Sequence, residues 1–199
     1  LLGRNGAGRS TTLKAIMNMV GRRTGSIVIN GNETLRMKPH HIPRLGIGYC
    51  PEERGIFASL DVHENLLLPP TVRSGGMSLD EIYAMFPNLY ERRRSQGTRL
   101  SGGEQQMLAM ARILRTGARL LLLDEITEGL APVIVQKLGE VLVQLKERGM
   151  TIVLVEQNFR FAAPLADRHF VMDHGQIVEE VTAAQLPSRR EHLNSMLGV

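Results

Sequence analysis

The sequence contains one cysteine and no tryptophan, and aromatic residues make up only 4% of its 199 residues. The single thiol at Cys50 excludes a disulfide within the chain and fits a reducing compartment. Cys50 ends the mostly apolar run 47–50, so we expect its thiol to be buried and unreactive. No apolar run approaches the roughly 18 residues that a membrane-spanning helix needs, so a membrane role requires a separate partner chain.

The scarcity of aromatic residues also limits what the basic charge, a formal +4, implies about partners. Arginine clusters occur at 22–23, 92–94 and 189–190, but they are short and lack interleaved aromatic side chains on which bases stack. We interpret these clusters as solvated surface or as contacts with anionic lipid, and we expect no nucleic-acid partner. The six histidines show no metal-ligand spacing.

Short apolar or β-branched runs alternate with helical patterns over most of the chain. We expect strands at 25–30, as part of a hairpin, and at 45–50, 119–123, 151–155, 169–173 and 176–181. We expect helices at 9–19, at 62–68, from 78 or 80 to 94 with a break near Pro87, at 101–115, from Pro132 to Gly149, at 158–166, and two short ones starting at 182 and 190.

This order predicts an α/β fold with a mainly parallel sheet flanked by helices. The middle of the chain shows helices without intervening strands, so we expect a helical subdomain at about 58–115, inserted into a single domain 1–199.

The first twelve residues, Leu1–Thr12, fit the phosphate-loop pattern G-x-x-x-x-G-K-[ST] with arginine in place of lysine. In this pattern glycines let backbone N–H groups turn toward phosphates, a following helix adds its positive end, and a hydroxyl reaches magnesium. The expected phosphate contacts are Gly3, Arg4, Asn5, Gly6, Ala7, Gly8, Arg9, Ser10 and Thr11. A glycine-rich turn between a strand and a helix without any ligand is the alternative on this stretch alone.

Two acids follow the apolar run 120–123 directly, namely Asp124 and Glu125. The carboxyl ends of parallel strands meet at one edge of a sheet, so we expect both acids to lie near the phosphate loop. Asp124 is expected to hold magnesium across from Ser10, and Glu125 to orient and deprotonate an attacking water. The combination predicts a P-loop NTPase fold that binds a nucleotide and Mg²⁺.

A third motif lies shortly before this strand, where Leu100–Gln106 reads LSGGEQQ and has the form of a helix capping box. With a phosphate loop upstream, this motif resembles the signature LSGGQ of the ATP-binding-cassette (ABC) family. The resemblance implies that the helix N-terminus faces the γ-phosphate held by a second subunit, so that the site is complete only in a dimer. The residues assigned to this contact are Ser101, Gly102, Gly103 and Glu104.

Two further site residues transfer from the family. Glu52 lies where the family has its Q-loop, which implies contact with magnesium and with a membrane subunit. Gln157 occupies the switch position, where histidine is commoner, and keeps an amide able to reach the γ-phosphate. The expected magnesium residues are thus Ser10, Glu52 and Asp124, and the expected catalytic residues are Glu125 and Gln157.

Several departures from the family pattern are typical of one subgroup of the family. Segments 51–57, 127–132 and 154–158 resemble the ATP-binding subunits of branched-chain amino acid importers, a pattern shared by relatives that carry amides or urea. The resemblance runs from Gly3 to Val199 and lacks the family's opening strands. We therefore expect an N-terminally truncated chain, with the residue that stacks on the nucleotide base lying before Leu1.

The resemblance implies an ATPase that energises import through a transmembrane permease. The expected solute is a branched-chain amino acid or a related amide or urea solute. Further expected partners are a second ABC ATPase subunit, identical or different, and indirectly a solute-binding protein. The expected location is peripheral, at the cytoplasmic face of the bacterial inner membrane. Segment 54–68, with apolar Ile56, Phe57 and Leu60, is either a docking surface for the permease or part of the subdomain core.

Arg9 replaces the lysine of the phosphate-loop pattern, and the chain has two alternative interpretations. A guanidinium keeps the positive charge of lysine but is planar and bidentate, so we expect ATP binding with slow to moderate hydrolysis. One alternative is a soluble ABC ATPase that acts on nucleic acid or ribosomes. The other is an ATP-sensing module with little turnover because of Arg9.

Overall fold

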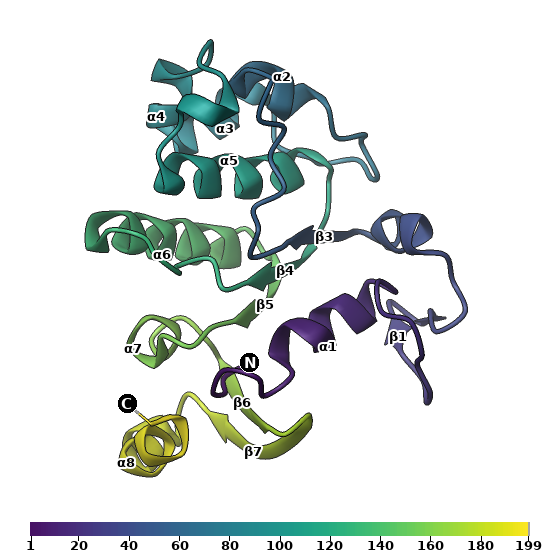
Figure 1. Ribbon diagram of the computed structural model, residues 1–199, viewed down its shortest axis with the longest axis vertical. Helices are drawn as coiled ribbons and strands as arrows, with labels where there is room; N and C mark the ends of the chain where they lie inside the picture. Colours follow the sequence, from purple (N-terminus) through teal and green to yellow (C-terminus); the bar gives the residue numbers. More distant parts are fainter. Residues whose placement is uncertain (199) are drawn as a thin grey trace.

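The computed structural model describes residues 1–198, in which helices and strands alternate (Figure 1). The α-helices are α1 (Arg9–Ile16), α2 (Val62–Leu67), α3 (Leu79–Met85), α4 (Pro87–Glu91), α5 (Gly102–Arg115), α6 (Pro132–Glu147), α7 (Phe159–Ala162) and α8 (Leu186–Leu197). The 3-10 helices are η1 (Pro39–Leu45) and η2 (Gly97–Arg99). The strands are β1 (Val28–Ile29), β2 (Asn32–Glu33), β3 (Ile47–Cys50), β4 (Leu120–Asp124), β5 (Thr151–Val155), β6 (Arg168–Asp173) and β7 (Gln176–Thr182).

A parallel sheet in the order β3-β4-β5 forms the centre of the molecule. In β4, Leu121 to Leu123 are at most 1% exposed, which confirms that this leucine run is a central strand covered on both faces. Parallel bridges join Leu2 to Glu156 and to Val171. The residue just before the phosphate loop therefore lies between the end of β5 and strand β6.

Helices cover the two faces of the sheet, as the expected α/β class requires. Successive side chains of a strand point to opposite faces. Leu121 and Leu123 accordingly pack in a core with α5 and α6, whereas Leu122 packs in a second core with Leu13 of α1. Figure 1 shows the same layers, with α5 and α6 on one side of the sheet and α1 on the other. Helix α1 thus begins beside the carboxyl end of β4.

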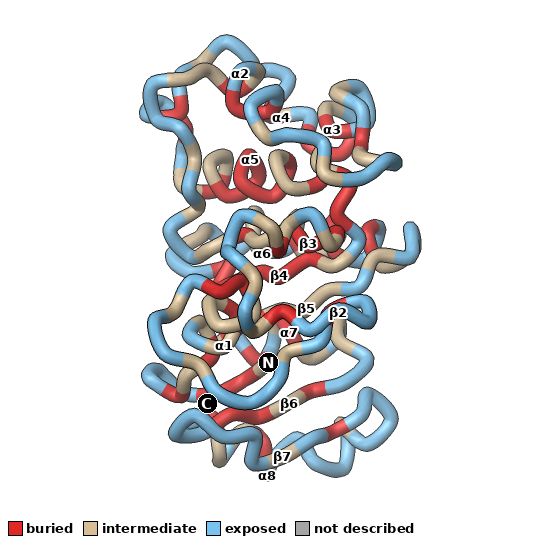
Figure 2. Tube along the Cα trace, turned by 90° about the vertical axis from the view of Figure 1, so that its right-hand side faces the viewer, coloured by how far each residue is buried: buried red, intermediate tan, exposed pale blue. Residues whose placement is uncertain are grey.

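Between β3 and β4, the described chain forms helices and no strand. Figure 2 shows buried positions along α5 and β4, with exposed positions on the outer turns of α2 and α4. Capping boxes begin three of these helices, with the N-cap residues Asp61, Ser78 and Ser101. The helical segment agrees with the expected insertion, while a separate subdomain at about 58–115 stays a prediction.

Helix α6 follows the apolar stripe expected from the sequence. Leu138, Val141, Leu142 and Leu145 are buried against the main core. Ile134, the first residue of the stripe, is only partly buried because it lies at the start of the helix, against Gly103 of α5. A Cβ on Gly103 would lie 2.9 Å from the Ile134 side chain, so a larger residue there would force Ile134 to shift.

Some helices end earlier than expected, among them α4, which ends at Glu91 rather than at 94. Helix α1 ends at Ile16 rather than Met19, because Asn18 adopts a left-handed φ of 58° and its amide donates to the backbone carbonyls of Thr34 and Met37. Helix α7 ends at Ala162, although a helix was expected to continue to 166.

The expectation of two short C-terminal helices was wrong, since α8 is continuous from Leu186 to Leu197. Its proline lies in the first turn, where a missing N–H costs no helical hydrogen bond. The chain before α8 belongs to β7, and the side chain of Gln185 closes the connecting turn by accepting hydrogen bonds from Thr182.

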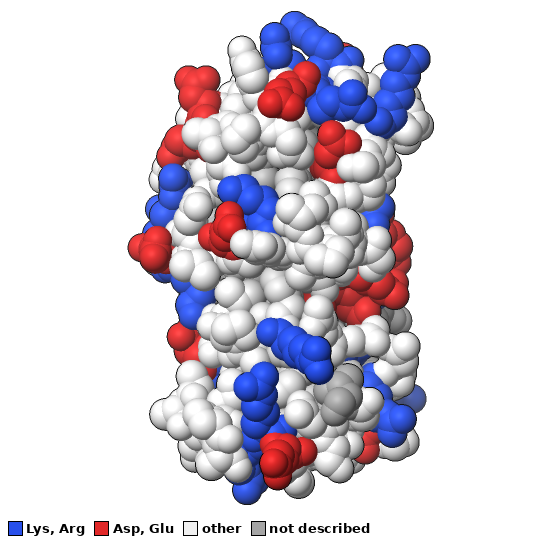
Figure 3. Space-filling view, turned by 90° about the vertical axis from the view of Figure 1, so that its left-hand side faces the viewer, with Lys and Arg blue, Asp and Glu red and all other residues white. Residues whose placement is uncertain are grey.

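The surface carries both signs of charge. Figure 3 shows Lys and Arg side chains gathered at the end of the molecule formed by the helical segment. The exposed arginines 92–94 lie there, and Arg92 approaches Glu104 while Arg94 approaches Asp61. These contacts support the interpretation of that cluster as solvated surface. No helix within residues 1–198 has the length and apolarity needed to cross a membrane.

Candidate active site

The phosphate loop connects Leu2 to α1 and depends on glycine at three positions. Gly6 and Gly8 have φ values of 79° and 103°, in the region that favours glycine, and Gly8 is the N-cap of α1. At Gly3 the reason is space, since a Cβ would lie 2.5 Å from the carbonyl oxygen of Met172. The loop therefore packs directly on β6 while it turns into the helix.

The loop borders an open cavity of about 380 Å³. Residues 5–11 line one side of this cavity, and Glu52, Glu125, Glu128 and Gln157 line the other. The structure therefore brings three predicted site residues from other parts of the chain next to the loop, namely Glu52, Glu125 and Gln157. Gly3 and Arg4 instead contribute, with other loop residues, to a neighbouring cavity of about 550 Å³ between the loop, β6 and α8.

Ser10 and Asp124 meet directly at the edge of the sheet. The Ser10 hydroxyl donates to Asp124 Oδ1 at 2.9 Å, and the Tyr49 hydroxyl lies 3.3 Å from Asp124 Oδ2. Burial raises the pKa of Asp124 above its ordinary value, and these two hydrogen bonds offset only part of that rise. The pair was expected from the sequence because β4 and the phosphate loop end at the same edge.

The oxygen atoms of Ser10 and Asp124 are suitable ligands for a magnesium ion that also binds phosphate. Within residues 1–198, no three His, Cys, Asp or Glu side chains lie close enough together to hold a metal by themselves. Mg²⁺ prefers hard oxygen ligands and usually keeps waters and substrate phosphates alongside one or two protein ligands. The oxygens of Ser10 and Asp124 match that preference, and Glu52 lines the same cavity as Ser10.

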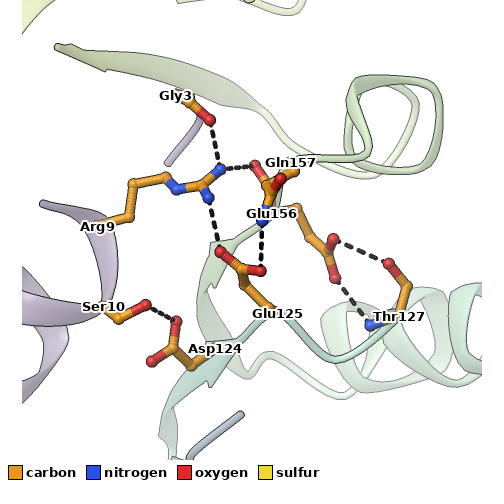
Figure 4. Close-up of polar contacts among 8 residues, drawn as sticks. All are labelled: Gly3, Arg9, Ser10, Asp124, Glu125, Thr127, Glu156 and Gln157. Carbon is orange, nitrogen blue, oxygen red and sulfur yellow. Dashed lines mark hydrogen bonds and ion pairs between the residues drawn. The ribbon is translucent and has the colours of Figure 1, made fainter. Parts of the chain in front are cut away.

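Arg9 makes contacts that sequence reasoning did not anticipate (Figure 4). Its side chain is 4% exposed, and its Nη2 donates to Glu125 Oε1 at 2.6 Å in a buried ion pair. Its Nη1 donates to the backbone carbonyls of Gly3 and Glu156. The guanidinium therefore joins the phosphate loop, the acid after β4 and the residue after β5.

Glu125 is held by partners at both carboxylate oxygens. Besides the bond from Arg9, Gln157 Nε2 donates to Glu125 Oε2 at 2.7 Å. The backbone of Glu125 has a φ of 47°, a left-handed conformation that is costly for a residue with a Cβ. The expected catalytic residues Glu125 and Gln157 are thus in direct contact.

Sequence reasoning assigned no role to Glu156, although this acid stands at the end of β5. Its carboxylate is buried and accepts hydrogen bonds from the backbone N–H and the hydroxyl of Thr127. Burial raises the pKa of Glu156 to about 7, against the lowering effect of the Thr127 hydrogen bonds. A glutamate directly after an apolar strand was the one sequence signal for this contact.

The signature helix lies apart from this cavity in the chain described here. Ser101 caps α5 and forms the expected reciprocal hydrogen bonds with Glu104. Residues 101–104 are not among those lining the cavity beside the phosphate loop. The next residue, Gln105, holds the start of α5 by donating to the carbonyls of Gly97 and Leu100.

A phosphate loop that opens α1 beside the carboxyl ends of a parallel sheet, with helices between β3 and β4, defines an ATP-binding cassette. A family model described as ABC transporter matches residues 1–128. The chain belongs to the ABC transporter family, as one of its ATP-binding subunits, and ATP hydrolysis is the reaction of that class.

Individual relatives cover the whole chain. It is 39% identical to the high-affinity branched-chain amino acid transport ATP-binding protein BraG of Pseudomonas aeruginosa, over 100% of this chain and 86% of that protein. It is 31% identical to the lipopolysaccharide export ATP-binding protein LptB of Haemophilus influenzae, over 100% and 84%. A dimeric ATP-binding cassette solved after hydrolysis with ADP and Pi has the same fold, with a TM-score of 0.79, 24% identity, and coverage of 92% of this chain and 83% of that one.

Proposed function

We propose that the chain is the ATP-hydrolysing subunit of an importer for branched-chain amino acids or a related amide or urea solute. The observation that carries the proposal is the meeting of Ser10, Asp124, Glu125 and Gln157 around one phosphate loop. The solute class rests on the 39% identity to BraG across the whole chain, compared with 31% to the exporter subunit LptB.

In this proposal the loop binds the phosphates of ATP through its backbone N–H groups and the N-terminus of α1. Ser10 and Asp124, with Glu52 nearby, would hold Mg²⁺, which would supply positive charge to the phosphate oxygens. Glu125 orients the attacking water and accepts its proton, and the Gln157 amide holds Glu125 in place at 2.7 Å.

Arg9 is the residue that distinguishes this site from the family pattern. Three of its five N–H donors are bonded to acceptors, and one of these acceptors is Glu125, so a phosphate beside the guanidinium competes with Glu125 for its charge. Phosphate oxygens carry more negative charge than one carboxylate and accept the planar guanidinium well. We therefore propose ATP binding with slow to moderate hydrolysis, in which nucleotide frees Glu125 from Arg9.

A second cassette completes the site in this proposal. Ser101 and Gly103 lie at the N-terminus of a 14-residue helix, whose positive end suits a γ-phosphate, yet they lie outside the loop's own cavity. The signature helix of one subunit therefore serves the phosphate loop of the other. The second subunit is either an identical or a different cassette.

The remaining partners are a transmembrane permease and, through it, a solute-binding protein. The subunit is proposed to be peripheral, at the cytoplasmic face of the inner membrane. Phe57 is 45% exposed beside the Glu52 loop and is the proposed permease contact, while Ile56 packs partly on the core. Assembly with the permease should be lost in a Phe57→Asp variant that still folds, and intact assembly would refute the contact.

ATP hydrolysis by the purified chain, assembled with its permease, tests the function. The assembled wild type should hydrolyse ATP above a Glu125→Gln control, and solute should accelerate the rate. Turnover no higher than the control contradicts the proposal and favours an ATP-sensing module. Turnover that responds to nucleic acid or ribosomes, without binding to a permease, favours a soluble ABC ATPase.

A further inference from the structure

Glu156 is a buried acid that the proposed reaction does not use. It is 2% exposed, and its two carboxylate oxygens accept hydrogen bonds from the same residue, Thr127 (Figure 4). The backbone N–H of Thr127 lies 3.1 Å from Oε1 and its hydroxyl 2.9 Å from Oε2. Burying a carboxyl group is costly unless such bonds compensate, so packing alone does not favour an acid at this position.

Thr127 belongs to the turn that carries Glu125. The left-handed backbone of Glu125 persists only if the chain on both sides of it is held in place. On one side the Glu125 N–H donates to the carbonyl of Val155 at 2.9 Å. On the other side Thr127 is bound by the carboxylate of Glu156, and both anchors lie at the end of β5.

The chain around Glu156 is also linked to the carboxylate of Glu125 in two other ways. Its carbonyl accepts a bond from Arg9, which in turn pairs with Glu125. The next residue, Gln157, donates to the second oxygen of Glu125. We infer that Glu156 is a positioning residue, whose carboxylate ties the turn of Thr127 to β5 and so aligns Glu125 to orient and deprotonate the attacking water. This inference rests on the proposed ATP hydrolysis.

Substitutions at the two ends of the tether separate alignment from folding. Glu156→Ala removes both acceptors. Glu156→Gln keeps an oxygen for the Thr127 N–H and offers an amide hydrogen to its hydroxyl. Thr127→Val keeps the shape of the side chain and loses only the hydroxyl bond. Glu140→Ala is the matched control, because it removes an exposed carboxylate of α6 that pairs with the exposed Lys137.

The assay is steady-state ATP hydrolysis by the assembled transporter, with amide exchange of the nucleotide-free chain as the structural readout. Glu156→Ala should lower kcat roughly 10- to 100-fold and leave KM for ATP within about twofold, as expected for a misaligned catalytic group. It should also speed exchange of the Thr127 amide while core strands stay protected. Glu156→Gln should restore most of kcat, Thr127→Val should be intermediate, and Glu140→Ala should match wild type.

A wild-type kcat in Glu156→Ala, or a loss of kcat that glutamine does not rescue, overturns the positioning role while the proposed function stands. A parallel loss of ATP affinity and of protection throughout the sheet overturns it too, since that is the result of a structural role. If Glu156→Ala does not fold, Thr127→Val decides, and full kcat in that variant refutes the inference. Wild-type turnover no higher than Glu125→Gln instead refutes the proposed function and the positioning role together.

Discussion

Removing the guanidinium of Arg9 tests the buried pair at the centre of the site. Arg9→Ala leaves Glu125 without its ion-pair partner and takes a donor from the carbonyls of Gly3 and Glu156. The two side chains of the pair are 4% and 9% exposed, so solvent screens them little in the folded state. We expect a large loss of stability in the absence of nucleotide.

The size of the loss follows from the environment of Glu125. Breaking a buried ion pair typically costs about 3–5 kcal/mol, because a charge is left uncompensated. Here the Gln157 amide still donates to Glu125, and the open cavity admits water. We therefore expect the lower end, about 3 kcal/mol. For a domain of this size, that loss lowers Tm by about 6–12 °C.

The assay is urea and thermal unfolding in buffer without nucleotide or magnesium. Lys14→Ala is the matched control on α1, since its pair with Glu53 spans 3.7 Å between exposed side chains and should contribute at most about 1 kcal/mol. Adding Glu125→Gln to Arg9→Ala should recover part of the loss, because no unpaired carboxylate remains. A cost of Arg9→Ala below about 1 kcal/mol, or additivity of the two changes within about 0.5 kcal/mol, refutes the reasoning.

Three further predictions concern single side chains. Burial raises the pKa of Glu156 from 4.5 to about 7, so the folded state binds this proton more tightly and stability should fall as pH rises between those values, by at most about 3 kcal/mol. The free energy of unfolding, measured in urea at pH 5 and pH 8, should differ less in Glu156→Gln than in the wild type. An equal difference in both proteins would contradict the assignment of this pH dependence to Glu156. Burial raises the pKa of Cys50 to about 12, so a thiol reagent at pH 8 should label it only after denaturation, and rapid labelling of native protein would show otherwise. Leu108→Ala, at a fully buried position of α5, should cost about 2–5 kcal/mol with an unchanged urea m-value, and a smaller cost would mean that the core collapses around the site.

Local patterns predicted much of the fold because they depend on residues close together in the chain. The capping box of Ser101 and Glu104 placed the start of α5, and the leucines at 120–123 placed the central strand. Asp124 was expected beside Ser10 because carboxyl ends of parallel strands share an edge, and the two side chains do form a hydrogen bond.

Local patterns failed where a long-range contact decides the conformation. The end of α1 depends on the Asn18 amide, which is bound by carbonyls 16 and 19 residues away. For the C-terminal segment we expected two short helices, starting at 182 and 190. The structure contains one helix, α8, because Leu193 and Leu197 bury one face of it against β6, β7 and α7.

By itself, the sequence determined the class of protein, because the glycines of the phosphate loop, the capping box and the apolar strand ending in two acids are short-range features. Only the tertiary structure decided how the acids are used. Arg9 meets Glu125 across 116 residues, and Thr127 meets Glu156 across 29. No spacing encodes these partners, since each depends on which strand ends the packed sheet brings together and on which buried donors must be satisfied there.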